Sequence, residues 1–126
     1  RPAQNINLFT SDRIAYIRTK RMGWTIVSVY LIAKINIFDR ETYAKYEQDF
    51  MPIFEKYEGR MLSVDENPTV LEGSWPSTRT VISQFKDREA AMAWYNSDEY
   101  QALMQNRLKA SEGDIIITQD LSSKST

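Results

Sequence analysis

Residues 27–38 carry the strongest strand signal in the chain, because apolar side chains occupy every second position. The intervening positions are also mostly apolar, and Lys34 and Asn36 are the polar exceptions. A strand covered on one face only alternates more cleanly, so we expect both faces of this strand to be covered. One face holds Val27, Val29, Leu31, Ala33, Ile35 and Ile37, and the other holds Tyr30, Ile32 and Phe38.

After this strand the apolar positions recur at spacings of three and four, which is typical of an amphipathic helix. Asp39 is suited to the N-cap of this helix. Pro52 falls inside it and predicts a kink or a break, and Gly59 stands where a left-handed C-cap is expected. The apolar stripe comprises Tyr43, Tyr46, Phe50, Ile53 or Phe54, and Tyr57.

Short strands and turns follow the helix. The pattern predicts strands over residues 60–65, 69–72 and 79–86. Segments rich in turn-forming residues separate these strands. They are a turn at residues 66–68 and a loop at residues 73–77.

The last third of the chain returns to a helical pattern. Asp87 is an expected N-cap, and Ser97 is a second one within the same helical stretch. Gly113 is expected to break the chain before a final strand over residues 114–119. The apolar stripe comprises Ala90, Ala91, Trp94 and Tyr95, and continues with Tyr100, Leu103, Met104 and Leu108.

This order of elements predicts an α+β fold of the ferredoxin-like split βαβ type, β-α-β-β-α-β. Right-handed crossovers place both helices on one face of an antiparallel sheet. The other face would be bare and apolar, which is unusual for a monomer. We therefore expect a homodimer that pairs the two sheet faces. The domain is expected over residues 25–120, with a polar tail at 121–126.

The composition narrows the possible chemistry. The 126 residues contain no cysteine and no histidine, which excludes disulfides, thiolate metal sites and every histidine-based catalytic arrangement. Catalysis would have to use carboxylate, Tyr, Lys, Arg or amide groups. We expect no cofactor and no metal site, and a cytoplasmic protein.

The net charge of the chain is small, but the charged residues are distributed unevenly along it. The net charge of −1 gives no global field that would attract nucleic acid, and no apolar run reaches the length of a membrane span. Residues 1–24 differ from the rest because they are basic. They are interpreted as an N-terminal extension that is non-native or poorly ordered. The alternatives are a targeting segment, an arm that contacts nucleic acid or a membrane, and an ordered element packing on the domain or on a partner.

Several motifs together resemble the 1330 family of domains of unknown function, within the dimeric α/β-barrel superfamily. The resemblance covers about residues 27–120, and two positions depart from its commoner pattern. Ser74 stands where an acidic residue is usual, and Asp98 stands where proline is usual. The matching pieces are Phe38-Asp39, Tyr43, Tyr46, Tyr57-Glu58-Gly59-Arg60, the run from Val70 to Pro76, Arg79, Phe85, the run from Trp94 to Tyr100, and Arg107.

The resemblance implies a two-chain barrel with a cavity between sheet and helices in each subunit. The superfamily includes cofactor-independent oxygenases, haem-degrading enzymes and ligand sensors without catalysis, and fold alone does not choose among them. Three hypotheses follow. The protein binds a small aromatic or acidic molecule, or it is a cofactor-free monooxygenase or isomerase acting on a quinol-like substrate, or it is a structural dimer without a ligand.

Seven residues are candidates for lining such a pocket. Trp75 could stack a flat ligand and Arg79 could hold a carboxylate or enolate, or Arg79 could instead pair with Glu72 or an acid of the partner chain. Asn36 is a candidate because superfamily oxygenases can use an amide to steer oxygen chemistry. The aromatic candidates could equally be core residues, and they are Tyr43, Tyr46, Trp94 and Tyr100.

Overall fold

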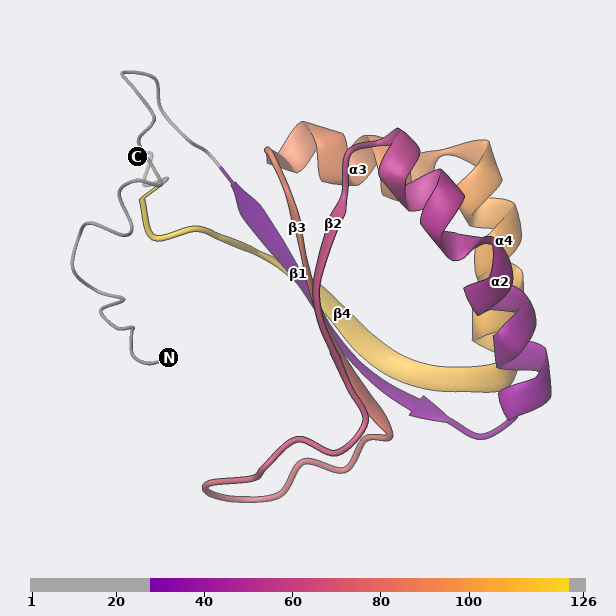
Figure 1. Ribbon diagram of the computed structural model, residues 1–126, viewed down its shortest axis with the longest axis vertical. Coiled ribbons are helices and arrows are strands. Elements are labelled where there is room, and N and C mark those ends of the chain that lie inside the picture. Colours follow the sequence, from indigo (N-terminus) through magenta and orange to yellow (C-terminus); the bar gives the residue numbers. More distant parts are fainter. Residues whose placement is uncertain (1–27, 123–126) are drawn as a thin grey trace.

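The computed structural model describes residues 28–122, which form a four-stranded antiparallel sheet with helices on one face (Figure 1). This arrangement confirms the predicted ferredoxin-like α+β fold. The extension at 1–24 and the end of the polar tail lie outside the described residues. The elements are β1 (Val29–Ile37), α2 (Arg40–Lys56), β2 (Arg60–Asp65), β3 (Arg79–Phe85), α3 (Arg88–Asn96), α4 (Asp98–Ala110) and β4 (Ser111–Gln119).

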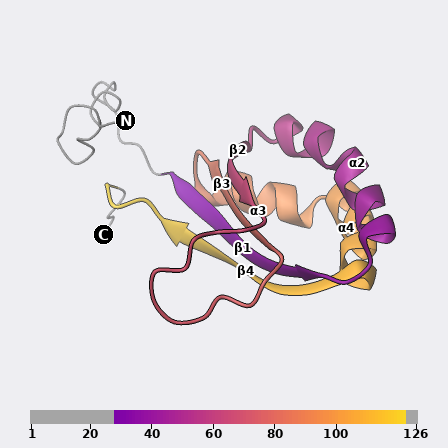
Figure 2. The same cartoon turned by 60° about the horizontal axis from the view of Figure 1, so that its bottom comes forward.

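The sheet has the order β2-β3-β1-β4, so the apolar strand β1 is central. The face of β1 that holds Val29 and Ile35 lies under the helices, and these two residues are 1% and 3% exposed. On the opposite face, no helix from residues 28–122 covers the sheet (Figure 2). On that face the strand register aligns Ile82, Ile32 and Ile116 across three strands.

The helix starts follow the predicted caps. The Asp39 carboxylate accepts from the amide of Thr42, and the Asp87 carboxylate accepts from the amide of Ala90. Ser97 ends α3 and caps α4, so the second helical stretch is two helices and the order is β-α-β-β-α-α-β. In residues 28–122, no helix combines the length and the apolar character that crossing a bilayer requires.

The structure narrows one expectation for the first helix and corrects another. Of the kink or break predicted at Pro52, the break is absent, because α2 continues through this residue. The left-handed residue after α2 is Glu58, with φ 66°, rather than Gly59. Gly59 has a different role, because a Cβ there would lie 2.5 Å from the ring of Phe54. The glycine is needed for the close approach of this ring.

Two strand predictions are also corrected. Residues 69–72 form no strand but belong to a long loop between β2 and β3, which projects beyond the sheet (Figure 1). Leu71 in this loop is 90% exposed. Gly113 does not end an element, because β4 begins at Ser111 and Gly113 pairs with Ile35 inside the ladder.

Aromatic rings pack between the helices and the sheet. Trp94 on α3 is 3% exposed, and its ring centroid lies 4.2 Å from Tyr100, 5.4 Å from Phe54 and 5.5 Å from Phe85. These contacts join α2, α3 and α4 to β3. Most of the aromatic side chains in residues 28–122 therefore belong to the core beneath the helices.

Candidate functional site

A cavity of about 290 Å³ lies between the helices and the covered face of the sheet. Its floor is formed by apolar and small residues of β1, β3 and β4, among them Ala33, Val81 and Ile115. Its walls are aromatic side chains of the three helices, including Phe50 and Trp94. The lining is thus mostly apolar, which is typical of a small-molecule site.

The exposure of the lining residues shows which side of the cavity is open. Met51 on α2 and Val64 on β2 are 37% and 50% exposed. Trp94, Tyr100 and Arg107 are each less than 9% exposed. The mouth therefore lies between α2 and the edge strand β2, and the closed end lies under α3 and α4.

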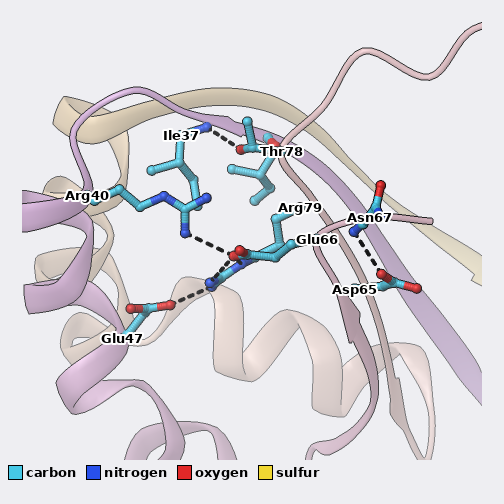
Figure 3. Close-up of polar contacts among 9 residues, drawn as sticks. Ile37, Arg40, Glu47, Asp65, Glu66, Asn67, Thr78 and Arg79 are labelled. Carbon is cyan, nitrogen blue, oxygen red and sulfur yellow. Dashed lines mark hydrogen bonds and ion pairs between the residues drawn. The ribbon is translucent and has the colours of Figure 1, made fainter.

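Arg79 lies at the mouth and is held by two carboxylates (Figure 3). Its guanidinium forms ion pairs of 2.6 Å with Glu47 of α2 and with Glu66, which follows β2. Glu66 also pairs with Arg40 at 3.0 Å, and hydrogen bonds from Arg40 and then Arg79 lower the pKa of the Glu66 carboxyl. Arg79 thus has acidic partners, as one interpretation of the sequence required, but Glu72 is not one of them.

Arg107 of α4 is the second cation of the lining, and it differs from Arg79. It is 7% exposed, and no carboxylate within residues 28–122 pairs with it. Its Nε has no hydrogen-bond partner there either. Its Cζ lies 5.8 Å from the ring centroid of Tyr46. Burial lowers the pKa of Arg107, but its interactions with Tyr100 and Tyr46 outweigh this and raise the pKa overall.

Two tyrosine hydroxyls meet beside Arg107. The hydroxyl oxygens of Tyr46 and Tyr100 are 2.7 Å apart, and both residues line the cavity. Burial, together with Tyr100, raises the pKa of Tyr46 well above its ordinary value. Tyr43 lies nearer the mouth, where burial raises its pKa and Arg79 lies 5.2 Å from its ring centroid.

Five of the seven predicted residues therefore line one cavity, and two do not. Asn36 points to the uncovered face of the sheet, where its cross-strand neighbour is Glu112. Trp75 also lies over that face, since its Nε1 donates to the Thr80 hydroxyl and Lys34 Nζ lies 4.7 Å from its ring centroid. The five residues of the cavity are Tyr43, Tyr46, Arg79, Trp94 and Tyr100.

Arg107 was not among the predicted site residues, although the sequence carries a signal for it. The spacing of Tyr100, Leu103, Met104 and Arg107 follows one helical stripe, and all four are buried. The apolar stripe was instead extended to Leu108, which is 53% exposed. A charged side chain on a buried stripe is the feature that marks this site.

No group of three or more acidic side chains that could hold a metal ion is present in residues 28–122. Taken together, the candidate site has three parts. They are an apolar cavity, a neutralised ion-pair cluster at its mouth, and a buried cation with two hydroxyls at its closed end.

The family model described as domain of unknown function (DUF1330) matches residues 28–121. The chain belongs to this family. The match contains every strand and helix that forms the cavity. No curated protein matches the chain.

Solved structures with the same fold include proteins with and without a described activity. A protein of unknown function from Rhodopseudomonas palustris is 17% identical, with a TM-score of 0.65, over 89% of this chain and 94% of that chain. SnoaB, a cofactor-independent oxygenase from Streptomyces nogalater, is 10% identical, with a TM-score of 0.56, over 79% and 99%. A putative antibiotic biosynthesis monooxygenase from Caulobacter crescentus is 13% identical, with a TM-score of 0.50, over 81% and 94%. These likenesses establish the fold of this DUF1330 protein.

The tyrosines of this DUF1330 domain predict a stability loss at high pH. Tyr30, whose hydroxyl donates to Asp120, has its pKa raised by burial and by this hydrogen bond from 10.0 to about 12. A raised pKa in the folded state stabilises the fold fully below pH 10.0, and this contribution is lost as the pH rises toward about 12. Tyr43 and Tyr46 act in the same direction.

We expect the free energy of unfolding to fall across this pH window. Urea unfolding at a series of pH values measures it, and the Tyr30→Phe variant should show a weaker fall than the wild type. Equal slopes for the two proteins would mean that the Tyr30 pKa is not raised in the folded state.

Proposed function

We propose that the protein is a homodimer in which the cavity of each chain binds a small aromatic or acidic molecule. The observation that carries this proposal is Arg107, a buried cation without a carboxylate partner in residues 28–122, facing a mostly apolar cavity. Burying an unpaired charge is costly, so Arg107 would only destabilise a core whose sole role is packing.

The size of the cavity supports a small ligand. Its volume of about 290 Å³ lies at the lower end of the range for ligand pockets, roughly 300–1,000 Å³. The aromatic walls from Phe50 and Trp94 favour a planar ring system over a flexible chain. A compound of one or two rings suits both features.

The uncovered sheet face supports the homodimer. Ile32, Ile82 and Ile116 form a row across three strands, and Ile116 is 56% exposed. A contiguous apolar row on an open sheet is typical of an interaction surface. A second copy of the same face would cover it with two-fold symmetry.

The dimer is tested by sedimentation. We expect a two-chain mass at micromolar concentration, and a one-chain mass for Ile116→Lys, since two lysines would be buried at the centre of the interface. Leu108→Lys is the matched control, because it makes the same change at an exposed position of α4. A one-chain mass for the wild type would contradict the proposed assembly.

Ligand binding is tested with a panel of one- and two-ring aromatic acids and neutral aromatics, using ligand-detected NMR and the tryptophan fluorescence of the protein, to which Trp94 in the cavity wall contributes. We expect binding to the wild type and its loss in Val81→Phe, which fills the cavity from β3. Val70→Phe is the control, because Val70 lies in the exposed β2–β3 loop. Failure of every compound, or equal binding by Val81→Phe, would contradict the proposed function.

One observation also favours the cofactor-free monooxygenase or isomerase as a second candidate. A cation beside two hydroxyls in a cavity of low polarity would stabilise the negative charge that develops when a quinol-like substrate is deprotonated. Oxygen uptake with a hydroquinone, or rearrangement of the compound, would assign this function. A bound but unchanged compound would assign binding alone.

A further inference from the structure

We infer that the closed end of the cavity is a site for a single anion, so that the ligand enters with its negative group first and a weakly acidic phenol or enol is bound in its ionised form. This inference rests on the proposed function and specifies the charge, the orientation and the ionisation state of the ligand. It is carried by the arrangement of Arg107, Tyr46 and Tyr100 at one end of an apolar cavity.

The first step is the balance of charges along the cavity wall. Its charged lining residues are Glu47, Arg79 and Arg107. Arg79 is neutralised by Glu47 and Glu66 at the mouth, and Glu66 is shared with Arg40. Among the lining residues that the structure describes, Arg107 is therefore the charge that no ion pair compensates.

The second step is the environment of Arg107. Its side chain is removed from water. Its contacts are with uncharged groups, namely the hydroxyls of Tyr46 and Tyr100 and the ring of Tyr46, and these compensate its charge only in part. Its Nε also lacks a hydrogen-bond partner within the described range. A ligand anion in the cavity would supply the missing counter-charge, whereas a cationic ligand would be repelled.

The third step is the pair of tyrosine hydroxyls. One of the two hydroxyls donates to the other across 2.7 Å, so one of their two protons remains free to donate elsewhere. A ligand oxyanion at this end would then accept from a hydroxyl while its charge faces the guanidinium. Both interactions favour the charged form of the ligand, so the pKa of a bound phenol falls below its value in water.

The fourth step is orientation. The mouth between α2 and β2 carries equal numbers of charges of both signs, and the wall between mouth and closed end is mostly apolar. An aromatic anion has one charged end and one apolar end. Both ends find favourable contacts only when the charge lies at Arg107 and the ring lies against the aromatic walls. A ligand with a second negative charge would place that charge against an apolar wall or beside Glu47, and is disfavoured.

The experiment compares 4-nitrophenol, whose ionised and neutral forms absorb at different wavelengths, with its neutral methyl ether, 4-nitroanisole. With the full-length wild-type protein, we expect the bound phenol to stay ionised at least about one pH unit below the point at which the free phenol is half ionised, a tenfold preference for the anion. We expect the ether to bind at least about tenfold more weakly than the phenolate.

Substitutions test whether Arg107 causes the preference for the anion and whether the probes bind in the cavity. Arg107→Met should remove the preference for the anion while the ether binds as in the wild type, and Arg107→Lys should restore part of the preference. Lys109→Met is the matched control, because it removes one positive charge from an exposed position in the last turn of the same helix. Val81→Phe should abolish binding of both probes, which places them in the cavity.

Three outcomes would overturn the inference. If the wild type binds the phenol in its protonated form, or the ether as tightly as the phenol, the closed end is not an anion site although the cavity still binds aromatics. This measurement needs no variant, so it holds even if Arg107→Met does not fold. If neither probe binds, the inference also fails, and the wider compound panel decides separately whether the cavity binds any ligand.

Discussion

Replacing Trp94 by alanine is expected to lower the free energy of unfolding by about 3–5 kcal/mol, because it truncates a buried aromatic side chain and leaves a void. The indole is 3% exposed and packs against Tyr100, Phe54 and Phe85. Its loss would also enlarge the existing cavity, so neighbouring side chains have little means of closing the gap. Urea unfolding, followed by far-ultraviolet circular dichroism, measures the change.

The Trp94→Phe variant keeps an aromatic ring in the core but removes the indole N–H, so it tests whether the loss of stability comes from packing. The indole Nε1 has no hydrogen-bond partner within residues 28–122, so its removal gives up no polar contact there. We therefore expect this variant to be destabilised clearly less than Trp94→Ala. A loss below about 1 kcal/mol for Trp94→Ala would show that the indole is not a core residue.

Replacing Gly113 by alanine is expected to cost about 1–3 kcal/mol, or more if the strand must shift. A Cβ at this position would overlap the backbone carbonyl oxygen of Lys34 and lie 3.0 Å from the Cα of Ile35. The overlap is with the backbone of the central strand, so no change of rotamer can relieve it. The β1–β4 ladder would have to open locally.

Thermal and urea unfolding of Gly113→Ala test this expectation. Glu112→Ala is the control, since Glu112 is an exposed neighbour in the same strand. Hydrogen exchange at the amides of β1 and β4 should quicken in Gly113→Ala alone. A Gly113→Ala protein as stable as the control would mean that the two strands can move apart without loss.

Much of the fold was predictable because the deciding interactions are local. The alternation in β1 and the caps at Asp39, Asp87 and Ser97 depend on residues within a few positions of each other. The loop at residues 69–72 was predicted as a strand because Val70 and Leu71 are apolar. Strand formation also needs a partner strand, and none of the described strands pairs with this segment.

The candidate site was only partly predictable because its members come from separate elements. The aromatic positions could be assigned from the helical period, although the period does not distinguish a solid core from the wall of a cavity. Asn36 and Trp75 were grouped with Arg79, but both lie on the opposite face. The pleat of β1 places Asn36 there, and the β2–β3 loop brings Trp75 onto Thr80 and Lys34. The partners of Arg79 are 32 and 13 residues away from it along the chain.

The sequence by itself determined the α+β fold, the first strand with two apolar faces, and the exclusion of cysteine and histidine chemistry. These properties depend on residue types and on their period along the chain. Only the tertiary structure decided that Arg79 is neutralised at the mouth of a cavity and that Arg107 is buried at its closed end without a carboxylate partner in residues 28–122. The physical reason is that the balance of charge in a buried space depends on which side chains the fold brings within a few ångströms, and no local pattern records that.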